Sequence, residues 1–227
     1  MALVGGSARN LRQHRSLQHP QIDPRARTPP PALIESNKPE ISRFARHIHH
    51  NIAHKLLALI ALALELPEDS FISSHRYDVR SDCHLRYMKY HACDAAPGDV
   101  WMEEHTDVGS LTLLFRQPVA ALQVRMPYDG DGDGGGKWKW VRPRDGSITV
   151  NVGDTLQFLT NGFLRSSIHR VVAPPLDQAG VDRLGVLYFV RPEDDLVLKP
   201  VESPVLERLG YKPEESTCVG EGIRAGD

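Results

Sequence analysis

The sequence predicts a mainly β fold, a sandwich or a barrel of short strands with helices flanking it. After Glu68, short segments rich in β-branched and aromatic residues are separated by Gly, Pro and Asp, and most follow one another without a helix between them. Before them, over residues 39–66, apolar residues recur every three or four positions, which is typical of an amphipathic helix. The 227 residues suit a single domain built around one core.

The long helix is expected over about residues 39–66 and should pack on one face of the β fold. Pro39 suits a first helical turn and Pro67 ends the apolar pattern. The apolar positions of this helix are Ile41, Phe44, Ile48, Ile52, Leu56, Leu59 and Ala63. Three histidines share a face at spacings of three and four residues: His47, His50 and His54. That spacing could bind a metal, but no carboxylate or cysteine accompanies it, so a solvated basic face is the favoured interpretation.

The expected strands follow the helix. They are residues 85–90, 110–115, 121–126, 137–141, 147–152, 155–159, 168–173 and 185–190. The Asp- and Gly-rich loop 129–136 matches the start of an EF-hand loop, but Trp140 stands where that motif requires a bidentate Glu. The same loop satisfies G-x-G-x-x-G, but its acidic residues would repel a phosphate and a strand follows it. We therefore interpret it as the mobile loop of a β-hairpin.

The two ends of the chain differ in composition from the rest. Residues 1–31 contain five arginines, one acidic residue and a Thr-Pro-Pro-Pro run, with too little apolar surface to offset the entropy of ordering. We expect residues 1–34 to form a flexible basic arm, 35–215 the folded domain and 216–227 a disordered tail. The arginine-rich start would also suit a mitochondrial presequence, although its prolines interrupt an amphipathic helix, and no apolar run after Met1 indicates secretion.

Composition also limits the partners and the compartment. A formal net charge of −2 gives no electrostatic reason to expect nucleic acid or an anionic membrane as partner. The longest strongly apolar run, residues 56–64, is stopped by Glu65 and is far shorter than the ~20 residues that a membrane-spanning helix needs. The cysteines Cys83, Cys93 and Cys218 are an odd, sparse set that suits a reducing compartment. We therefore expect a cytoplasmic monomer.

His105 and Asp107 are the first candidate metal ligands. In an extended segment, residues i and i+2 point to the same side, so these two side chains can address one point. A second histidine, His169, lies at the start of another expected strand. Two histidines and one carboxylate form the facial triad that binds Fe(II) and leaves three positions open to substrate and oxygen. Because His-x-Asp is common by chance, the alternative for His105 is a polar residue at a hairpin end.

Arg183 is a candidate for anion binding. It lies 14 residues after His169 and precedes an otherwise apolar segment, 184–189. A buried arginine at such a place needs an anion, and its guanidinium group matches a carboxylate in a bidentate manner. Taken alone, it is equally well a surface arginine at a strand end.

In combination these motifs resemble the 2-oxoglutarate/Fe(II)-dependent dioxygenases of the isopenicillin N synthase-like type, especially their fungal branch. The resemblance covers roughly residues 35–205 and depends on the order and spacing of several motifs. They are His105-Thr106-Asp107, Gly109-Ser110-Leu111-Thr112-Leu113-Leu114, Leu122-Gln123-Val124, Trp140-Val141, Asn151-Val152-Gly153-Asp154, Thr160-Asn161-Gly162 and Ser167-Ile168-His169-Arg170-Val171. The resemblance implies a double-stranded β-helix (jelly-roll) core with the long helix outside it.

Carried over to this sequence, the resemblance implies a role for each of seven residues. The implied iron ligands are His105, Asp107 and His169. Arg183 would bind the distal carboxylate of 2-oxoglutarate, and Tyr90 would help to hold this cosubstrate. Phe189 and Arg191 would line the substrate pocket. No catalytic residue beyond the iron site is expected.

The implied function is oxidation of a small organic molecule of secondary-metabolite type. With Fe(II), 2-oxoglutarate and O2, the family hydroxylates or desaturates an unactivated C–H bond and releases succinate and CO2. Residues 35–215 would then be the dioxygenase domain. Two alternatives remain open: a noncatalytic truncated jelly-roll protein that binds or scaffolds, and an Fe(II) oxidase of the same fold that does not use 2-oxoglutarate.

Two departures from the family pattern bear on this expectation. Gly185 stands where the family has a serine, two residues after the arginine. One hydrogen bond to the cosubstrate is therefore expected to be lost, which costs ~1.5–3 kcal/mol for a charged partner. Similar proteins also carry a substantial region before the long helix, where this sequence has the arginine-rich arm. We therefore expect an N-terminally short member of the family.

Overall fold

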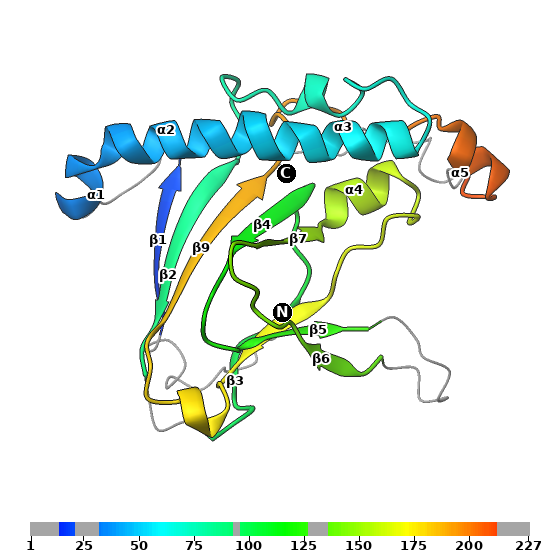
Figure 1. The fold of residues 1–227 in the computed structure, drawn as a ribbon. Helices are drawn as coiled ribbons and strands as arrows, with labels where there is room; N and C mark the ends of the chain where they lie inside the picture. The colour runs from blue at the N-terminus through cyan, green and yellow to red at the C-terminus, as the bar shows by residue number, and fades with distance from the viewer. Residues whose placement is uncertain (1–13, 21–31, 93–95, 127–135, 213–227) are drawn as a thin grey trace, which may run out of the picture.

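Two antiparallel β-sheets, with a long helix outside one of them, form the body of the protein (Figure 1). The structure is a computed structural model that describes residues 14–20, 32–92, 96–126 and 136–212. Within these ranges no helix is long and apolar enough to cross a bilayer.

The sheets contain five and four strands, and every pairing between neighbouring strands is antiparallel. In order, the larger sheet consists of β1 (His14–Pro20), β2 (His84–Tyr90), β9 (Arg183–Val190), β4 (Leu111–Phe115) and β7 (Ile148–Val152). The smaller sheet consists of β3 (Val100–His105), β8 (His169–Val172), β5 (Leu122–Arg125) and β6 (Trp138–Trp140). This arrangement confirms the double-stranded β-helix that the sequence predicted.

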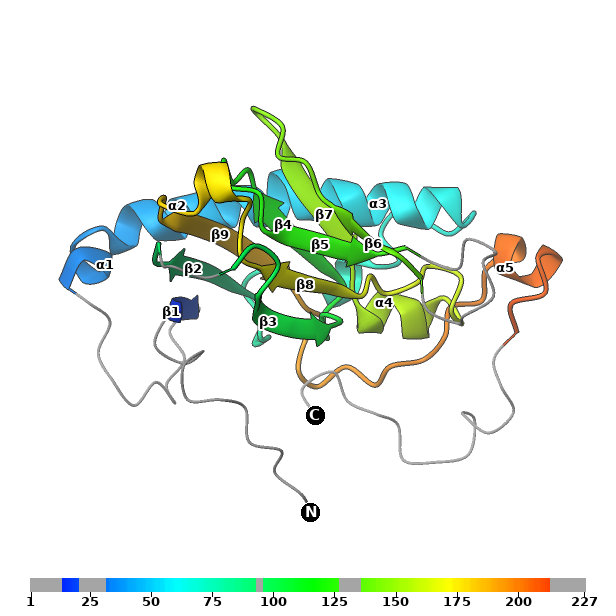
Figure 2. The ribbon, with the colours of Figure 1, turned by 90° about the horizontal axis from the view of Figure 1, so that it is seen from below.

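The long helix was also predicted correctly. It runs without a break through α2 (Lys38–Ile48), a π-helical turn η2 (His49–Ala53) and α3 (His54–Ala63), and its proline lies in the first turn. In Figure 2 this helix runs behind β2, β9 and β4. Its buried residues share one core with apolar residues of these strands. The other short helices are α1 (Ala32–Ser36), η3 (Ile72–Ser74), α4 (Asp154–Leu159), η4 (Leu176–Gln178) and α5 (Pro204–Arg208).

Alternation along β9 separates this core from the space between the sheets. Because successive side chains of a strand point to opposite faces, one set packs under the helix and the other faces the second sheet. Tyr188 and Val190 belong to the core beneath the helix. Arg183, Leu187 and Phe189 line a cavity on the opposite face. The strand therefore supports the fold with one face and a candidate site with the other.

In the region predicted to consist of strands, helix α4 and strand β3 differ from the sequence prediction. Residues 155–159, predicted as a strand, belong to helix α4; Leu156 and Leu159 are buried three residues apart on one side of it. A short apolar run of this kind is ambiguous between strand and helix. Conversely, β3 was not predicted, because Glu103 and Glu104 are both exposed and its pairing with β8 is irregular, which removes the alternation of a half-buried strand.

The N-terminal arm contains two elements that the sequence did not predict. Within the expected flexible arm, His14–Pro20 forms β1 against β2, and α1 begins at Ala32. Main-chain pairing to a sheet edge does not depend on an apolar composition, so the composition of the arm did not indicate it. The rest of the arm, most of the loop 129–136 and the expected tail lie outside the described residues. The strands β5 and β6 on either side of that loop do pair with each other.

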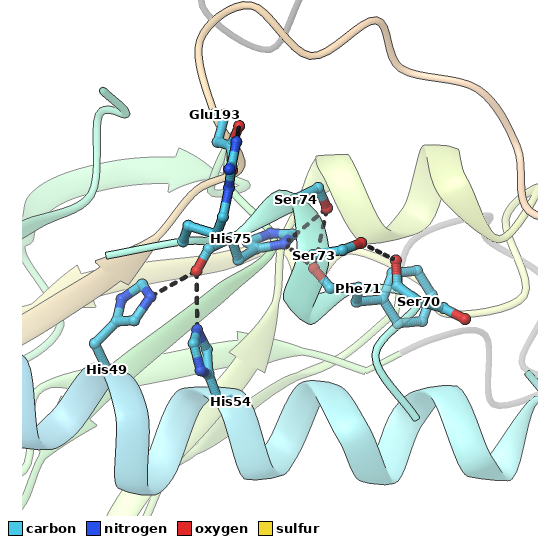
Figure 3. Close-up of polar contacts among 9 residues, drawn as sticks. His49, His54, Ser70, Phe71, Ser73, Ser74, His75 and Glu193 are labelled. Carbon is cyan, nitrogen blue, oxygen red and sulfur yellow. Dashed lines mark hydrogen bonds and ion pairs between the residues drawn. The ribbon is translucent and has the colours of Figure 1, made fainter. Parts of the chain in front are cut away.

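A network of two buried histidines and one half-buried histidine joins the long helix to the segment before β2 (Figure 3). His49 and His54 each point a ring nitrogen, Nε2, at the carbonyl oxygen of His75, at 2.7 and 2.9 Å. Since a carbonyl only accepts, both rings donate from Nε2. The remaining nitrogen of His49, Nδ1, therefore accepts from the hydroxyl of Tyr188 on β9, at 2.9 Å. His54 thus differs from the solvated face predicted for it, whereas His47 and His50 are exposed.

The ring of His75 continues this network toward β4. Its Nδ1 donates to the carbonyl oxygen of Phe71 at 2.7 Å, which leaves Nε2 to accept from the Ser110 hydroxyl at 2.7 Å. Ser110 immediately precedes β4 and is fully buried. Every ring nitrogen of His49 and His75 thus has a partner, as buried polar groups require.

The free energy of unfolding should decrease as the pH is lowered from neutral, because burial lowers the pKa of both His49 and His75 from 6.5 to about 4. Between these values the unfolded chain binds more protons than the folded one. The contribution of these two neutral histidines to the free energy of unfolding is therefore fully present above pH 6.5. It decreases as the pH falls toward 4, by roughly 3 kcal/mol for each histidine. Urea unfolding at a series of pH values measures this slope.

Two variants assign the slope to the network. His49→Gln should reduce the dependence of the free energy of unfolding on pH, because one of the two titrating groups is gone. His47→Gln, on an exposed position of the same helix, is the matched control and should leave the slope unchanged. An equal slope in His49→Gln and in the unaltered protein would contradict the assignment.

Candidate metal centre

A cavity of about 260 Å³ lies between the two sheets. Strands of both sheets contribute to its wall, which combines apolar side chains with polar and charged ones, as small-molecule sites do. Six of the seven site residues predicted from the sequence line it: Tyr90, His105, Asp107, His169, Arg183 and Phe189.

The pairing of β3 with β8 brings the two predicted histidine ligands together. His105 ends β3, and its partner across the pair is His169, the first residue of β8. Their ring centroids are 4.3 Å apart. Asp107 lies two residues beyond β3, with one carboxylate oxygen 3.9 Å from Nε2 of His105 and the other 3.9 Å from Nε2 of His169. One potential ligand atom from each of the three residues lies within 4.8 Å of the others, close enough to share one metal ion.

Both histidines present the nitrogen that a metal needs. Nδ1 of His105 donates to the carbonyl oxygen of Glu103, and Nδ1 of His169 donates to that of Ser167, each at 2.8 Å. Because the proton is on Nδ1, the lone pair of Nε2 is free on each neutral ring. In both cases the acceptor is the residue two positions earlier, so the local backbone sets the tautomer and the direction of the ring.

The carboxylate of Asp107 is held by two neighbours that sequence analysis did not identify. The Thr112 hydroxyl and the Asn151 side-chain amide both donate to Oδ2 of Asp107, at 2.7 and 2.9 Å. Thr112 is on β4 and Asn151 on β7, and these two residues are paired across the sheet. Polar residues within otherwise apolar strands were the available signal, but the sequence does not show which carboxylate they contact.

The residues around Asp107 are fixed by the first turn of α4. The backbone N–H groups of Asp154 and Thr155 donate to the carbonyl oxygens of Asp107 and Val108, at 2.7 and 3.2 Å. These N–H groups begin a helix and have no partner within it, so the contacts satisfy both segments. A side chain at Gly153 would collide with the carbonyl oxygens of Asp107 and Gly109, so glycine permits this close approach.

Arg183 and Tyr90 line the same cavity as the three candidate ligands. They are paired across β9 and β2, and the guanidinium carbon of Arg183 lies 5.1 Å from the centre of the Tyr90 ring. Arg183 is 3% exposed, and its Nε has no hydrogen-bond partner among the described residues. Burial lowers the pKa of this guanidinium. A buried cation with an unused donor is suited to bind an anion from the cavity.

Only one of the two residues predicted for the substrate pocket lines the cavity. Phe189 lines the cavity, whereas Arg191 is not part of its wall and instead forms an ion pair with Asp82 at 2.5 Å. Another arginine, Arg86 on β2, takes a place that the sequence did not indicate. Its guanidinium lies 4.6 Å from the centre of the Phe189 ring, and its Nε has no hydrogen-bond partner among the described residues.

The donor set fits an Fe(II) ion, with 2-oxoglutarate as a companion ligand. Two imidazole nitrogens and one carboxylate oxygen on one side of a cavity are the ligands of the facial triad, and the cavity leaves room for other ligands. The buried Arg183 offers an anion site in the same cavity. The residues could therefore hold the metal and a carboxylate-bearing chelator together.

The chain belongs to the 2OG-Fe(II) oxygenase superfamily. Residues 80–192 match this family. The 2-oxoglutarate-dependent dioxygenase iboH of Amanita muscaria is 33% identical over 188 residues, which are 82% of this chain and 87% of that protein. The 2-oxoglutarate-dependent dioxygenase gloE of Glarea lozoyensis is 36% identical over 182 residues, which are 80% of this chain and 52% of that protein.

Solved structures of the family share the fold. A full-length Neurospora crassa protein, crystallised in complex with alpha-KG, superimposes with a TM-score of 0.76 at 26% identity, over 94% of this chain and 63% of that one. The chain spans about half the length of several curated relatives it matches, 52% of gloE and 48% of the FG08081 dioxygenase of Gibberella zeae.

The contacts to Asp107 predict an effect on metal affinity. Thr112→Val and Asn151→Ala each remove one donor to Oδ2 and should weaken Mn(II) binding by about 10- to 100-fold, the usual effect of removing a partner of a metal ligand. Electron paramagnetic resonance of Mn(II) titrations measures the affinity. Thr149→Val, which removes a hydroxyl from the same cavity wall two residues before Asn151, is the control. Unchanged affinity in both variants would exclude a supporting role for these residues.

Proposed function

We propose that this chain is a non-haem Fe(II), 2-oxoglutarate-dependent dioxygenase that hydroxylates or desaturates a small organic substrate, with succinate and CO2 as co-products. The observation that carries the proposal is the presence, in one cavity, of a His-Asp-His cluster and of a buried arginine with an unused donor. Membership of the 2OG-Fe(II) oxygenase superfamily and the alpha-KG bound to the similar Neurospora crassa protein support it.

In this proposal His105, Asp107 and His169 bind the iron. The backbone acceptors of the two Nδ1 protons keep both Nε2 atoms ready for the metal, and Thr112 and Asn151 hold the carboxylate in place. Arg183 receives the distal carboxylate of 2-oxoglutarate, with Tyr90 beside it. Iron with 2-oxoglutarate supplies the O2-dependent oxidising chemistry. The apolar walls exclude water, which strengthens the ion pair to Arg183 and protects the reaction from side reactions.

The cavity favours a small, largely apolar substrate that carries an oxygen acceptor, in keeping with the secondary-metabolite type expected from the sequence. Apolar side chains from β4, β5 and β9 make up much of the wall. Phe189 offers a ring face, and Arg86 beside it offers a donor to a carbonyl or carboxylate group of the substrate. This proposal gives Arg86 the place that the resemblance had given to Arg191.

Residues 35–215 would form the dioxygenase domain of a cytoplasmic, monomeric protein that acts on a small molecule and binds neither nucleic acid nor membrane. The net charge of −2 and the sparse cysteines support this assignment, and a mitochondrial location is the alternative.

Loss of one iron ligand should abolish the proposed activity. His105→Ala is expected to remove O2- and Fe(II)-dependent conversion of 2-oxoglutarate to succinate, measured by mass spectrometry in the presence of candidate substrates. His47→Ala, at an exposed position on α2, is the control for histidine removal. Succinate formation that survives His105→Ala would rule out this iron site, and its absence from the folded, Fe(II)-loaded unaltered protein would favour the noncatalytic alternative.

Arg183 separates use of 2-oxoglutarate from other oxidase chemistry. Arg183→Met should weaken 2-oxoglutarate binding to the anaerobic Fe(II) protein roughly a hundredfold, because removal of one partner of a buried charge pair costs about 2–5 kcal/mol. The charge-transfer absorption of the complex measures binding. Arg80→Met, at an exposed ion pair with Asp194, is the control. If 2-oxoglutarate binds equally well to both variants, Arg183 does not hold the cosubstrate.

A further inference from the structure

We propose that the side-chain amide of Gln117 donates a hydrogen bond to the 2-oxoglutarate carboxylate at Arg183, in the place left free by Gly185. This inference rests on the proposed function, because it concerns the same cosubstrate. It replaces the lost hydrogen bond expected from the sequence with a donor from another strand. In this proposal Gly185 provides the space and Gln117 provides the hydrogen-bond donor.

Gly185 on β9 lies in contact with the side chain of Gln117. Gly185 follows Arg183 by two residues, so both face the cavity side of the strand. A Cβ atom at residue 185 would overlap Nε2 of Gln117 and lie 3.7 Å from Cδ of that side chain. The amide of Gln117 therefore lies against the bare backbone of Gly185, where a serine side chain would begin. A serine there would displace the amide.

Gln117 is also placed to serve a ligand. It lies just beyond the end of β4, is 7% exposed and lines the cavity together with Arg183. Gln117 and Arg183 are also among the residues that line a smaller hollow of about 20 Å³. The amide N–H groups of Gln117 are donors that a carboxylate bound at Arg183 could accept from.

The chemistry of the amide suits this role. Its two N–H groups donate and carry no charge, so the amide adds a hydrogen bond to the carboxylate that Arg183 neutralises. A glutamate at the same position would be similar in shape but would repel the carboxylate and pair with Arg183. Comparison of the unaltered protein with the Gln117→Glu variant thus tests the hydrogen bond while the volume of this side chain stays nearly the same.

The experiment measures the dissociation constant of 2-oxoglutarate by calorimetry on the whole chain loaded with Mn(II), so that no turnover is involved. Gln117→Ala should weaken binding by about 10- to 100-fold, the effect of one hydrogen bond to a charged group. Adding Gly185→Ser to Gln117→Ala should restore most of the affinity, because the serine hydroxyl now has room and supplies a donor. Adding Gly185→Ala instead fills the same space without a donor and should restore none.

Further variants make the result unambiguous. Gln117→Glu should weaken binding at least as much as Gln117→Ala and does not create a void. Gln123→Ala, which removes a buried glutamine that contacts Arg170 outside the cavity, should leave the affinity unchanged. Unchanged affinity for 2-oxoglutarate in Gln117→Ala and Gln117→Glu would overturn the role of Gln117 and leave the proposed function standing. Equal recovery of affinity with Gly185→Ser and Gly185→Ala would do the same. Failure of the unaltered Mn(II) protein to bind 2-oxoglutarate would instead overturn the proposed function.

Discussion

The contact between the first turn of α4 and the backbone after β3 is the constraint on which the candidate site depends. Two N–H groups at the start of the helix hold the carbonyl oxygens of Asp107 and Val108, and this approach requires glycine at position 153. The segment is thereby fixed between the last residue of β3 and the first residues of β4. Its geometry places the carboxylate of Asp107 beside Nε2 of both histidines, and it determines where Ser110 meets the buried histidine network.

Alternation on β2 and β9 links that site to the core. The same two strands supply apolar residues to the helix on one face and the polar end of the cavity on the other. Arg183 and Tyr90 are neighbours because the two strands pair in one register. A shift of one residue would turn Arg183 to the opposite face of the sheet, where Leu184 is exposed. The position of Arg183 in the cavity is thus specified by the pairing register and the alternation of side chains along the strands.

Much of this arrangement could be predicted from the sequence because its signals are local. Periodicity indicated the helix and most strands, and His105-Thr106-Asp107 with the distant His169 indicated the metal ligands that the structure brings together. Contacts between distant segments were not predictable: the donors to Asp107, the place of Arg86 in the cavity and the ion pair of Arg191 depend on strand register. Membership of the oxygenase superfamily is confirmed, whereas the isopenicillin N synthase-like type and the individual residue roles stay predictions.

The histidine network has a consequence for how the chain folds. Its members come from positions 49, 54, 75, 110 and 188, and no single hairpin or helix contains a complete set of partners. The two partners of the His49 ring lie 26 and 139 residues away along the chain, so this ring cannot be buried with both hydrogen bonds until β9 has joined the sheet. Such contacts between distant positions slow folding and make it cooperative, so the helix and the central strands should gain protection from hydrogen exchange together. We therefore expect the hydrogen bonds of the histidine network to form together with the apolar core around them.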